Sequence, residues 1–282
     1  MFNFEQEIHA GNNFNIIKKV FMKKRLQFLA CLFLAYCCFT LCKETSASRI
    51  QYNLVNGLPD IYVHPISEKI GCTWEKGVVW DKPLIEKFYS LLPKDSFFVM
   101  LDLGAQTGSF SLLAKYFPNS QWYSFEPLEE AAETLKKNLA LNDINNVTVY
   151  QLAGSNFTGK TTLKMPPMDC WGLATIGSNV QRFVPLNARP IECIELDSFL
   201  VAHNIERVHF MKIDTEGSEL AILQGAKKMI MRDHPIILME YQPINMKQCG
   251  ASKDEIDNFL REMGCQWEMV SAEDILCIPI VR

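Results

Sequence analysis

The stretch Val99-Met-Leu-Asp-Leu-Gly-Ala-Gln-Thr-Gly-Ser-Phe-Ser111 decides the fold of this chain. Its apolar start is short and uninterrupted, which favours a strand buried on both faces, as in a parallel sheet. Gly104 and Gly108 then allow a sharp turn and a close approach of the backbone to a ligand, because neither has a Cβ. A helix is predicted directly after the turn, and its free N–H groups favour electron-rich ligand atoms. Asp102 ends the strand, at the edge where open α/β sheets bind their ligands.

The glycine turn matches neither of two common nucleotide-binding loops. The dinucleotide fingerprint G-x-G-x-x-G needs a glycine at the position of Gln106, where a side chain would obstruct a pyrophosphate. A phosphate loop needs Lys followed by Ser or Thr after the second glycine, and this chain has Ser109-Phe110. An acidic residue before the turn instead suits a cationic or amine-bearing ligand. The stretch resembles motif I of class I S-adenosylmethionine-dependent methyltransferases; a purely structural strand-turn-helix is the alternative.

Length, charge and cysteine content limit the class of protein. With 282 residues the chain is long enough for one sizeable domain and an appendage. A net charge of −4 argues against a general nucleic-acid binder, which would show a basic patch, so no nucleic-acid partner is expected. The ten cysteines include no C-x-x-C pair, which argues against a zinc site.

Residues 1–47 have the features of a targeting segment. The basic residues of its middle part, which precede an apolar run at residues 26–42, are Lys18, Lys19, Lys23, Lys24 and Arg25. Small residues follow the run, as in a cleaved signal peptide, although the run is nearly long enough for an uncleaved membrane anchor. The basic flank should remain cytoplasmic. We therefore expect the rest of the chain in the lumen of the secretory pathway or anchored to the membrane, with a cytoplasmic domain as the alternative.

Two N-glycosylation sequons would become available in a lumen, Asn146-Val-Thr and Asn156-Phe-Thr. Asn156 follows a predicted strand near the expected ligand crevice, where a glycan would be obstructive. Asn146 precedes the same strand, so we expect it to be the freer acceptor.

The rest of the chain has the alternating rhythm of a doubly wound α/β protein. Residues 48–96 are predicted to form a cap segment, and residues 97–282 the main domain. Besides the first stretch, strands are predicted at residues 121–126, 147–152, 210–214 and 234–240, with helices at 110–116, 130–141, 218–231 and 253–263. This rhythm predicts a mainly parallel sheet, closed by an antiparallel pair at residues 266–270 and 275–280. Residues 154–196 interrupt it as either a substrate lid or a surface hairpin.

Carboxylates occur where four of the predicted parallel strands end: Asp102, Glu126, Asp214 with Glu216 just beyond it, and Glu240. Because the carboxyl ends of such strands meet at one crevice, we expect these side chains to gather there. Glu126 has the spacing from the glycine turn at which an acid binds ribose hydroxyls. That role is common to dinucleotide and S-adenosylmethionine sites.

The stretch Lys212-Ile-Asp-Thr-Glu-Gly-Ser-Glu-Leu-Ala-Ile-Leu-Gln-Gly-Ala226 resembles the signature of the FkbM family of methyltransferases. Residues 101–105, 125–127 and 235–240 match the same family, so the resemblance extends over residues 97–241. Gln106 replaces the asparagine that is usual in the family. The resemblance implies a Rossmann-like class I fold, S-adenosylmethionine as cofactor, and O-methylation of a hydroxyl on a sugar, glycan or related metabolite. A non-catalytic S-adenosylmethionine-binding module with the same fold is the alternative.

The resemblance also implies roles for individual residues. Asp102, Gly104 and Gly108 would bind the methionine part of the cofactor, and Glu126 the ribose. We expect Asp102→Ala to weaken cofactor binding with little loss of fold.

The acceptor hydroxyl needs a base, and the candidates are Asp214, Glu216 and Glu240. Glu216 could instead cap the helix that follows it. The same three carboxylates could also bind Mg²⁺ through hard oxygen ligands, by fold-level analogy with catechol-type methyltransferases. The sequence leaves this metal question open.

Overall fold

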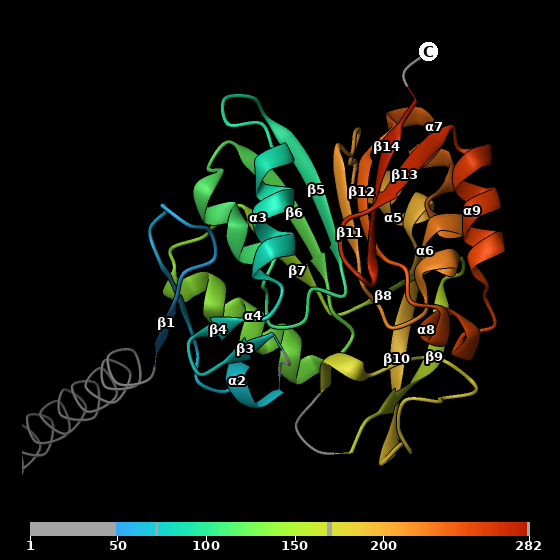
Figure 1. The fold of residues 1–282 in the computed structure, drawn as a ribbon, viewed down its shortest axis with the longest axis horizontal. Coiled ribbons are helices and arrows are strands. Elements are labelled where there is room, and N and C mark those ends of the chain that lie inside the picture. The colour runs from blue at the N-terminus through green and yellow to red at the C-terminus, as the bar shows by residue number, and fades with distance from the viewer. Residues whose placement is uncertain (1–48, 71–72, 168–170, 281–282) are drawn as a thin grey trace, which may run out of the picture. The chain divides into compact units, whose positions relative to one another are not determined.

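A seven-stranded sheet organises the computed structural model, which describes residues 49–70, 73–167 and 171–280 (Figure 1). The strands lie in the order β13-β14-β12-β11-β5-β6-β7. Their bounds are β5 Phe98–Leu103, β6 Ser120–Phe125, β7 Val147–Tyr150, β11 Phe210–Ile213, β12 Ile236–Glu240, β13 Cys265–Met269 and β14 Asp274–Pro279. Strands β7, β6, β5, β11 and β12 are parallel, whereas β14 runs antiparallel to β12 and to β13. The predicted Rossmann-like sheet with its closing antiparallel pair is confirmed.

Strand β5 is buried on both faces because helices cover both sides of the sheet. Its residues Val99, Leu101 and Leu103 belong to one apolar cluster, and Phe98 and Met100 to another. The first cluster includes side chains of α5 (Leu196–Ala202), α6 (Glu219–Gly225), α7 (Lys227–Asp233) and α9 (Lys253–Glu262). The second includes side chains of α3 (Lys82–Leu91), the 3₁₀ helix η1 (Ser111–Tyr116) and α4 (Glu129–Leu141). The continuous apolar run of β5 follows from this two-sided burial.

The segment before β5 packs into the second cluster. Its elements are β1 (Ile50–Tyr52), β2 (Ile61–Val63), α2 (Ser67–Ile70), β3 (Trp74–Glu75), β4 (Val78–Val79) and α3. Trp74 is buried in this cluster, and its indole Nε1 donates a hydrogen bond of 2.8 Å to Oγ1 of Thr107 in the glycine turn. The cap segment therefore supports the loop on which the expected site depends.

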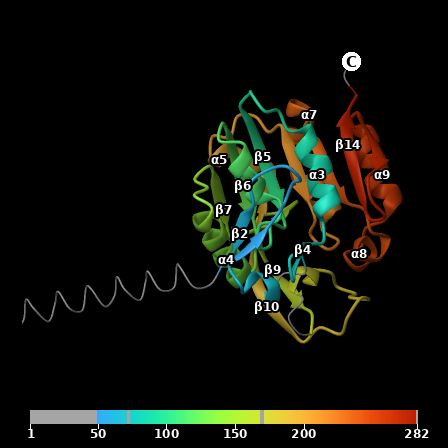
Figure 2. The ribbon, with the colours of Figure 1, turned by 60° about the vertical axis from the view of Figure 1, so that its left-hand side comes forward.

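The interruption at residues 154–196 forms a second sheet. Strands β8 (Ala153–Ser155), β9 (Gly159–Met165) and β10 (Asn187–Glu195) lie in the order β8-β10-β9, and the short helix η2 (Trp171–Leu173) follows β9. Leu163, Met165 and Ile191 of this sheet pack against Leu128 and Ala131 at the start of α4. The β9–β10 hairpin thus lies beyond the carboxyl ends of the large sheet, below it in Figure 2.

Several predicted elements differ in detail from the structure: the helix expected at residues 218–231 is divided into α6 and α7, and two further differences have a visible physical cause. The helix expected at about residues 110–116 is present as the 3₁₀ helix Ser111–Tyr116, because its hydrogen bonds join residues three apart, as from the N–H of Leu113 to the carbonyl of Phe110. The strand expected from His234 begins at Ile236. His234 is left-handed (φ 50°) and ends α7, with its N–H donating to the carbonyl of Ile230.

Residues 1–47, predicted to be a signal peptide or membrane anchor, lie outside the described residues. Within the described part of the chain, no helix is both long and apolar enough to span a bilayer. Residues Ile50–Arg282 form one compact unit, which includes both the cap segment and the main domain.

Candidate active site

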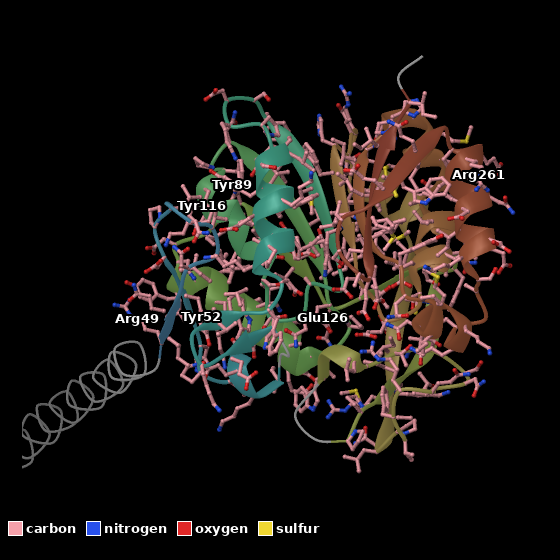
Figure 3. The ribbon with its side chains drawn as sticks, in the orientation of Figure 1. Arg49, Tyr52, Tyr89, Tyr116, Glu126 and Arg261 are labelled. Atoms are coloured by element: carbon pink, nitrogen blue, oxygen red, sulfur yellow. The ribbon has the colours of Figure 1, made fainter. Side chains whose placement is uncertain are left out.

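The site lies where the strand order reverses. From β5 the chain continues to β6 on one side, whereas β11 and β12 lie on the other side. Ligands of open α/β sheets bind beyond the carboxyl ends of the strands at this reversal. Gly104, Glu126 and Asp214 follow β5, β6 and β11 directly. Figure 3 shows Glu126 at this lower end of the large sheet.

Two adjoining cavities open at these strand ends. Gly104, Gln106, Gly172, Asp214 and Glu216 line both of them. The larger has a volume of about 880 Å³, within the usual range of about 300–1,000 Å³ for small-molecule sites. The smaller has a volume of about 70 Å³.

The two cavities differ in character. The smaller is mainly apolar, with Phe125, Leu128, Leu152, Leu163, Trp171, Ile176 and Ile191 around the carboxylate of Glu126. The larger is polar and mostly acidic: besides Trp74 and Trp80, it is lined by Glu68, Glu75, Asp81, Glu240, Glu273, Asp274, Lys69, Lys76, Arg182 and Lys212. An apolar compartment and an acidic compartment thus share a wall at Asp214 and Glu216.

Different neighbours exclude a side chain at each of the two glycines of the turn. Gly104 is left-handed (φ 76°), and a Cβ there would lie 1.9 Å from the carbonyl oxygen of Asp214. Gly108 also has a positive φ (105°), but its Cβ would meet Leu135 of α4, and it lines neither cavity. Gly104 therefore lies in the site as predicted, whereas the structure places Gly108 against a helix. Whether either contacts the cofactor stays a prediction.

Glu126 holds the glycine loop in place. Its Oε2 accepts from the N–H of Gln106 and its Oε1 from the N–H of Leu128, both at 2.9 Å. Burial raises the pKa of this carboxyl group to about 7. Gln106 is itself left-handed (φ 50°), and its side chain bonds to Thr107 and to the carbonyl of Ile70. The glutamine in the position of the usual asparagine thus braces the loop through its amide.

Asp102 is buried beneath the turn. Its side chain is fully inaccessible, its Oδ2 accepts a hydrogen bond of 2.6 Å from Ser111, and it lines neither cavity. Its Oδ1 lies 3.9 Å from Nζ of Lys212 and accepts no hydrogen bond from the described residues. Burial raises the pKa of this carboxyl group. The geometry makes Asp102 a support for Lys212 and η1; direct contact with the methionine part remains a prediction.

Lys212 links the strand ends to one another. The side chain is nearly buried, and Nζ lies 3.3 Å from Oδ2 of Asp214 and 3.1 Å from the carbonyl oxygen of Gly104. Burial alone would lower the pKa of Lys212, but Asp214 and Asp102 raise it above its ordinary value. Lys212 is therefore a permanent cation that lines the larger cavity, next to Asp214 in the wall shared by the two cavities.

Asp214, Glu216 and Glu240 come together as expected. One carboxyl oxygen of each lies within 4.8 Å of the others, and we call these three residues the carboxylate cluster. Oε2 of Glu216 accepts from Arg182 and from Nδ2 of Asn245, both at 2.7 Å. The same Asn245 nitrogen donates to Oε1 of Glu240 at 2.6 Å. Burial and the charge of Asp214 raise the pKa values of Glu216 and Glu240.

The expected alternative for Glu216, a helix cap, is not what the structure shows. Its side chain bonds to Arg182 and Asn245, and its backbone is left-handed (φ 56°). Glu219 holds the turn instead, because its Oε1 accepts from the N–H groups of Thr215 and Gly217. The side chain of Glu216 takes no part in capping the helix, and it lines both cavities.

Three polar partners of the cluster had no role in the sequence prediction. Lys212 has a visible signal, a lysine inside an otherwise apolar strand. Arg182 comes from the segment between β9 and β10, and Asn245 from α8 (Pro243–Gln248). No sequence motif marks either of these two residues.

Comparison with known proteins agrees with this geometry. A family model described as the Methyltransferase FkbM domain matches residues 102–266, more than half of the chain. The chain belongs to the FkbM methyltransferase family. The fold is accordingly the class I methyltransferase fold that the resemblance implied, with the glycine turn, Glu126 and the carboxylate cluster all inside the matched region.

The individual relatives of this chain are distant. Methyltransferase 1 of Beauveria bassiana is 29% identical over 161 residues, which cover 50% of this chain and 63% of that protein. Methyltransferase sdnD of Sordaria araneosa is 29% identical over 162 residues, or 48% of this chain and 61% of that protein. The chain thus spans about three fifths of the length of these curated relatives. The crystal structure of an FkbM methyltransferase from Methylobacillus flagellatus KT matches at 20% identity with a TM-score of 0.46, covering 67% of this chain and 45% of its own.

Proposed function

We propose that this protein is an S-adenosylmethionine-dependent O-methyltransferase that acts on a hydroxyl of a sugar, glycan or related metabolite. The observation that carries the proposal is the meeting of an apolar and an acidic cavity at Asp214 and Glu216. Methyl transfer brings two substrates into contact at one point, and alignment of nucleophile and methyl group supplies much of the rate. Two adjoining cavities that are both lined by Asp214 and Glu216 would let the cofactor and the acceptor meet there.

The smaller cavity, of about 70 Å³, suits only one part of the adenosine of the cofactor, and the rest would extend into the adjoining larger cavity. The apolar lining of the smaller cavity can cover a base, and Glu126 can bind ribose hydroxyls. Each carboxyl oxygen of Glu126 accepts one backbone N–H, which leaves acceptor capacity on both oxygens. The methionine part would then lie along Gly104 and Asp214, toward the larger cavity. When bound, S-adenosylmethionine supplies an electrophilic methyl group.

The larger cavity suits a hydroxyl-rich acceptor. Carboxylates accept hydrogen bonds from hydroxyl groups, and the exposed indole of Trp80 offers an apolar face beside them. This combination supports a sugar or related polyol as the acceptor class.

The carboxylate cluster would receive the proton of the acceptor hydroxyl. A general base works best when its pKa is near the working pH, and burial raises the pKa of Glu216 toward that range. Asp214 lies beside it with a side chain 43% exposed, so it can accept a hydrogen bond from the incoming hydroxyl. Arg182 and Asn245 hold Glu216 in position through hydrogen bonds to its Oε2.

The test has two parts. Calorimetry with S-adenosylhomocysteine measures cofactor binding, and labelled methyl transfer onto glycans and a cell extract, followed by mass spectrometry, identifies the product. We expect binding and transfer in the wild type, binding without transfer in Asp214→Asn, and both in the control Glu133→Gln, whose exposed carboxylate lines neither cavity. Binding with no transfer to any acceptor would favour the non-catalytic module, and no binding would exclude both functions.

We also propose that residues 1–47 place the domain in the lumen of the secretory pathway or anchor it to the membrane. The basic flank before the apolar run at residues 26–42 supports that orientation. S-adenosylmethionine is generally a cytosolic product, so a luminal enzyme requires its import. Protease protection in sealed microsomes tests the placement: a domain digested without detergent, while a luminal marker survives, is cytosolic.

A further inference from the structure

The carboxylate cluster is held from outside by polar partners, each of which occupies one oxygen of a carboxyl group. Oδ2 of Asp214 faces Lys212, and Oε2 of Glu216 faces Arg182 and Asn245. The second oxygen of each of these two carboxyl groups has no hydrogen-bond partner among the described residues. Partners arranged in this way fix the orientation of a carboxylate and leave one oxygen for a ligand.

Glu240 gives the same indication independently. The residue is only 7% exposed, and its Oε1 accepts from Asn245. Its Oε2 is buried and has no hydrogen-bond partner in the described part of the chain. A buried polar atom without a partner is costly, so it indicates a ligand that the protein alone does not supply. The residue lines the larger cavity together with Asp214 and Glu216.

The charges around the cluster are not balanced by side chains. Asp102 and the three carboxyl groups of the cluster share two cationic partners, Lys212 and Arg182. We propose that the carboxylate cluster is a binding site for one divalent cation of the Mg²⁺ or Mn²⁺ class, ligated by one oxygen each of Asp214, Glu216 and Glu240. Carboxylate oxygens without histidine or cysteine are the ligand set these hard cations prefer.

The inference rests on the proposed function and makes the acceptor more specific. Three protein ligands leave coordination positions open, because Mg²⁺ and Mn²⁺ take about six ligands. The open positions face the larger cavity, since all three residues line it. An acceptor with two neighbouring oxygens, such as a vicinal diol, would bind there by chelation. The ion would orient that acceptor hydroxyl at the wall shared with the cofactor compartment.

A proton on Glu240 is the alternative to a metal ion in the carboxylate cluster. If Glu240 simply keeps a proton in place of a metal ion, the cluster is a structural hydrogen-bonded group and needs no cation. The two explanations differ in one measurable property, the affinity of the purified full-length chain for a divalent ion.

The experiment is a titration with Mn²⁺, followed by the loss of the electron paramagnetic resonance signal of the free ion. We expect one Mn²⁺ per chain, displaced by excess Mg²⁺, and at least about tenfold weaker binding in Glu240→Gln. Glu75→Gln is the control, because Glu75 lines the same cavity outside the cluster and should leave the affinity unchanged. Asp214→Asn is the second variant, and circular dichroism checks that each variant is folded.

The outcomes separate this inference from the proposed function. Equal Mn²⁺ affinity in the wild type, Glu240→Gln and Asp214→Asn, or no binding at all, would overturn the cation site. S-adenosylhomocysteine titrations in EDTA report on the cofactor compartment alone. Cofactor binding without Mn²⁺ binding leaves the proposed function intact and removes the cation site. Mn²⁺ binding without cofactor binding supports the cation site and contradicts the proposed function.

Discussion

Gly104 and the carbonyl group of Asp214 lie so close together that a Cβ on Gly104 would stand 1.9 Å from the carbonyl oxygen. The contact joins the ends of β5 and β11, where the N–H of Asp214 also donates to the carbonyl of Leu103 at 3.1 Å. The glycine is therefore required by the neighbouring strand. Because Gly104 and Asp214 line both cavities, the same contact forms their common wall.

Gly104→Ala should consequently disturb both the fold and the site. A left-handed alanine alone costs about 1–2 kcal/mol, and here the backbone of Asp214 must move as well. Gly57→Ala is the matched control, because Gly57 has nearly the same φ (80°) and no atom within 4 Å of an added Cβ. We expect a clearly larger loss of unfolding free energy and of S-adenosylhomocysteine affinity for Gly104→Ala, measured by urea denaturation and calorimetry. Equal losses in the two variants would contradict the role of the strand contact.

The fold could be predicted from the sequence because its signals are local. An apolar run such as that of β5 and the alternation of strands with helices reflect burial directly, so the sheet and its closing pair were predicted. The 3₁₀ type of the helix at Ser111 and the late start of the strand after His234 were not predicted, because hydrogen bonding and a left-handed residue decide them.

The site could be predicted only in part. Parallel strand ends meet at one edge, so the meeting of Asp214, Glu216 and Glu240 was predictable from their positions alone. The packing around each residue was not predictable: Asp102 is buried beneath the turn and Gly108 lies against Leu135, so neither lines a cavity. Arg182 and Asn245 reach the cluster through tertiary packing, which no local pattern records.

The burial of Asp102 changes the expectation for Asp102→Ala. Removing the carboxylate leaves Lys212 with one partner fewer in a buried place and breaks the bond to Ser111. Loss of one partner of a buried pair typically costs about 3–5 kcal/mol. We expect the unfolding free energy to fall by that order, with a smaller loss in Asp102→Asn, which keeps an acceptor for Ser111. Unchanged denaturation midpoints would contradict a supporting role.

The pKa of Glu126, raised by burial to about 7, gives cofactor binding a pH dependence. Ribose hydroxyls bind the ionised carboxylate more strongly than the protonated acid. Affinity for S-adenosylhomocysteine should therefore rise with pH, by about tenfold between pH 6 and pH 8, because the ionised fraction changes by that factor. Glu126→Gln should bind more weakly with a flat profile. A wild-type profile that matches the variant would exclude Glu126 as the titrating group.

The structure makes Asn156, and not Asn146 as expected from the sequence, the more accessible of the two glycosylation sequons. Nδ2 of Asn146 donates to the carbonyls of Phe117 and Ser120 and to the Ser120 hydroxyl. Among the described residues, Nδ2 of Asn156 donates to Gln224 alone, at an exposed position. If the domain is luminal, we expect a glycan on Asn156. A glycosidase-sensitive mass shift that Asn156→Gln removes and Asn146→Gln retains would agree, and the opposite pattern would contradict the prediction.

Glu240→Gln should stabilise the protein when divalent cations are absent. The pKa of Glu240 is raised by burial and by the charges of Asp214, Glu219 and Glu216. At a pH above the ordinary pKa of a glutamate, the unfolded chain has released the proton of Glu240, whereas the folded chain still holds it. The free energy of unfolding therefore falls as the pH rises. Glutamine has no such proton, and its carbonyl still accepts from Asn245. In EDTA, we therefore expect the melting temperature of the variant to exceed that of the wild type at pH 8 by at least about 2–4 °C, the shift for roughly 1 kcal/mol, and the difference to shrink toward pH 5. Glu75→Gln should follow the wild type throughout, and a Glu240→Gln curve parallel to both would show that repulsion within the cluster does not reach Glu240.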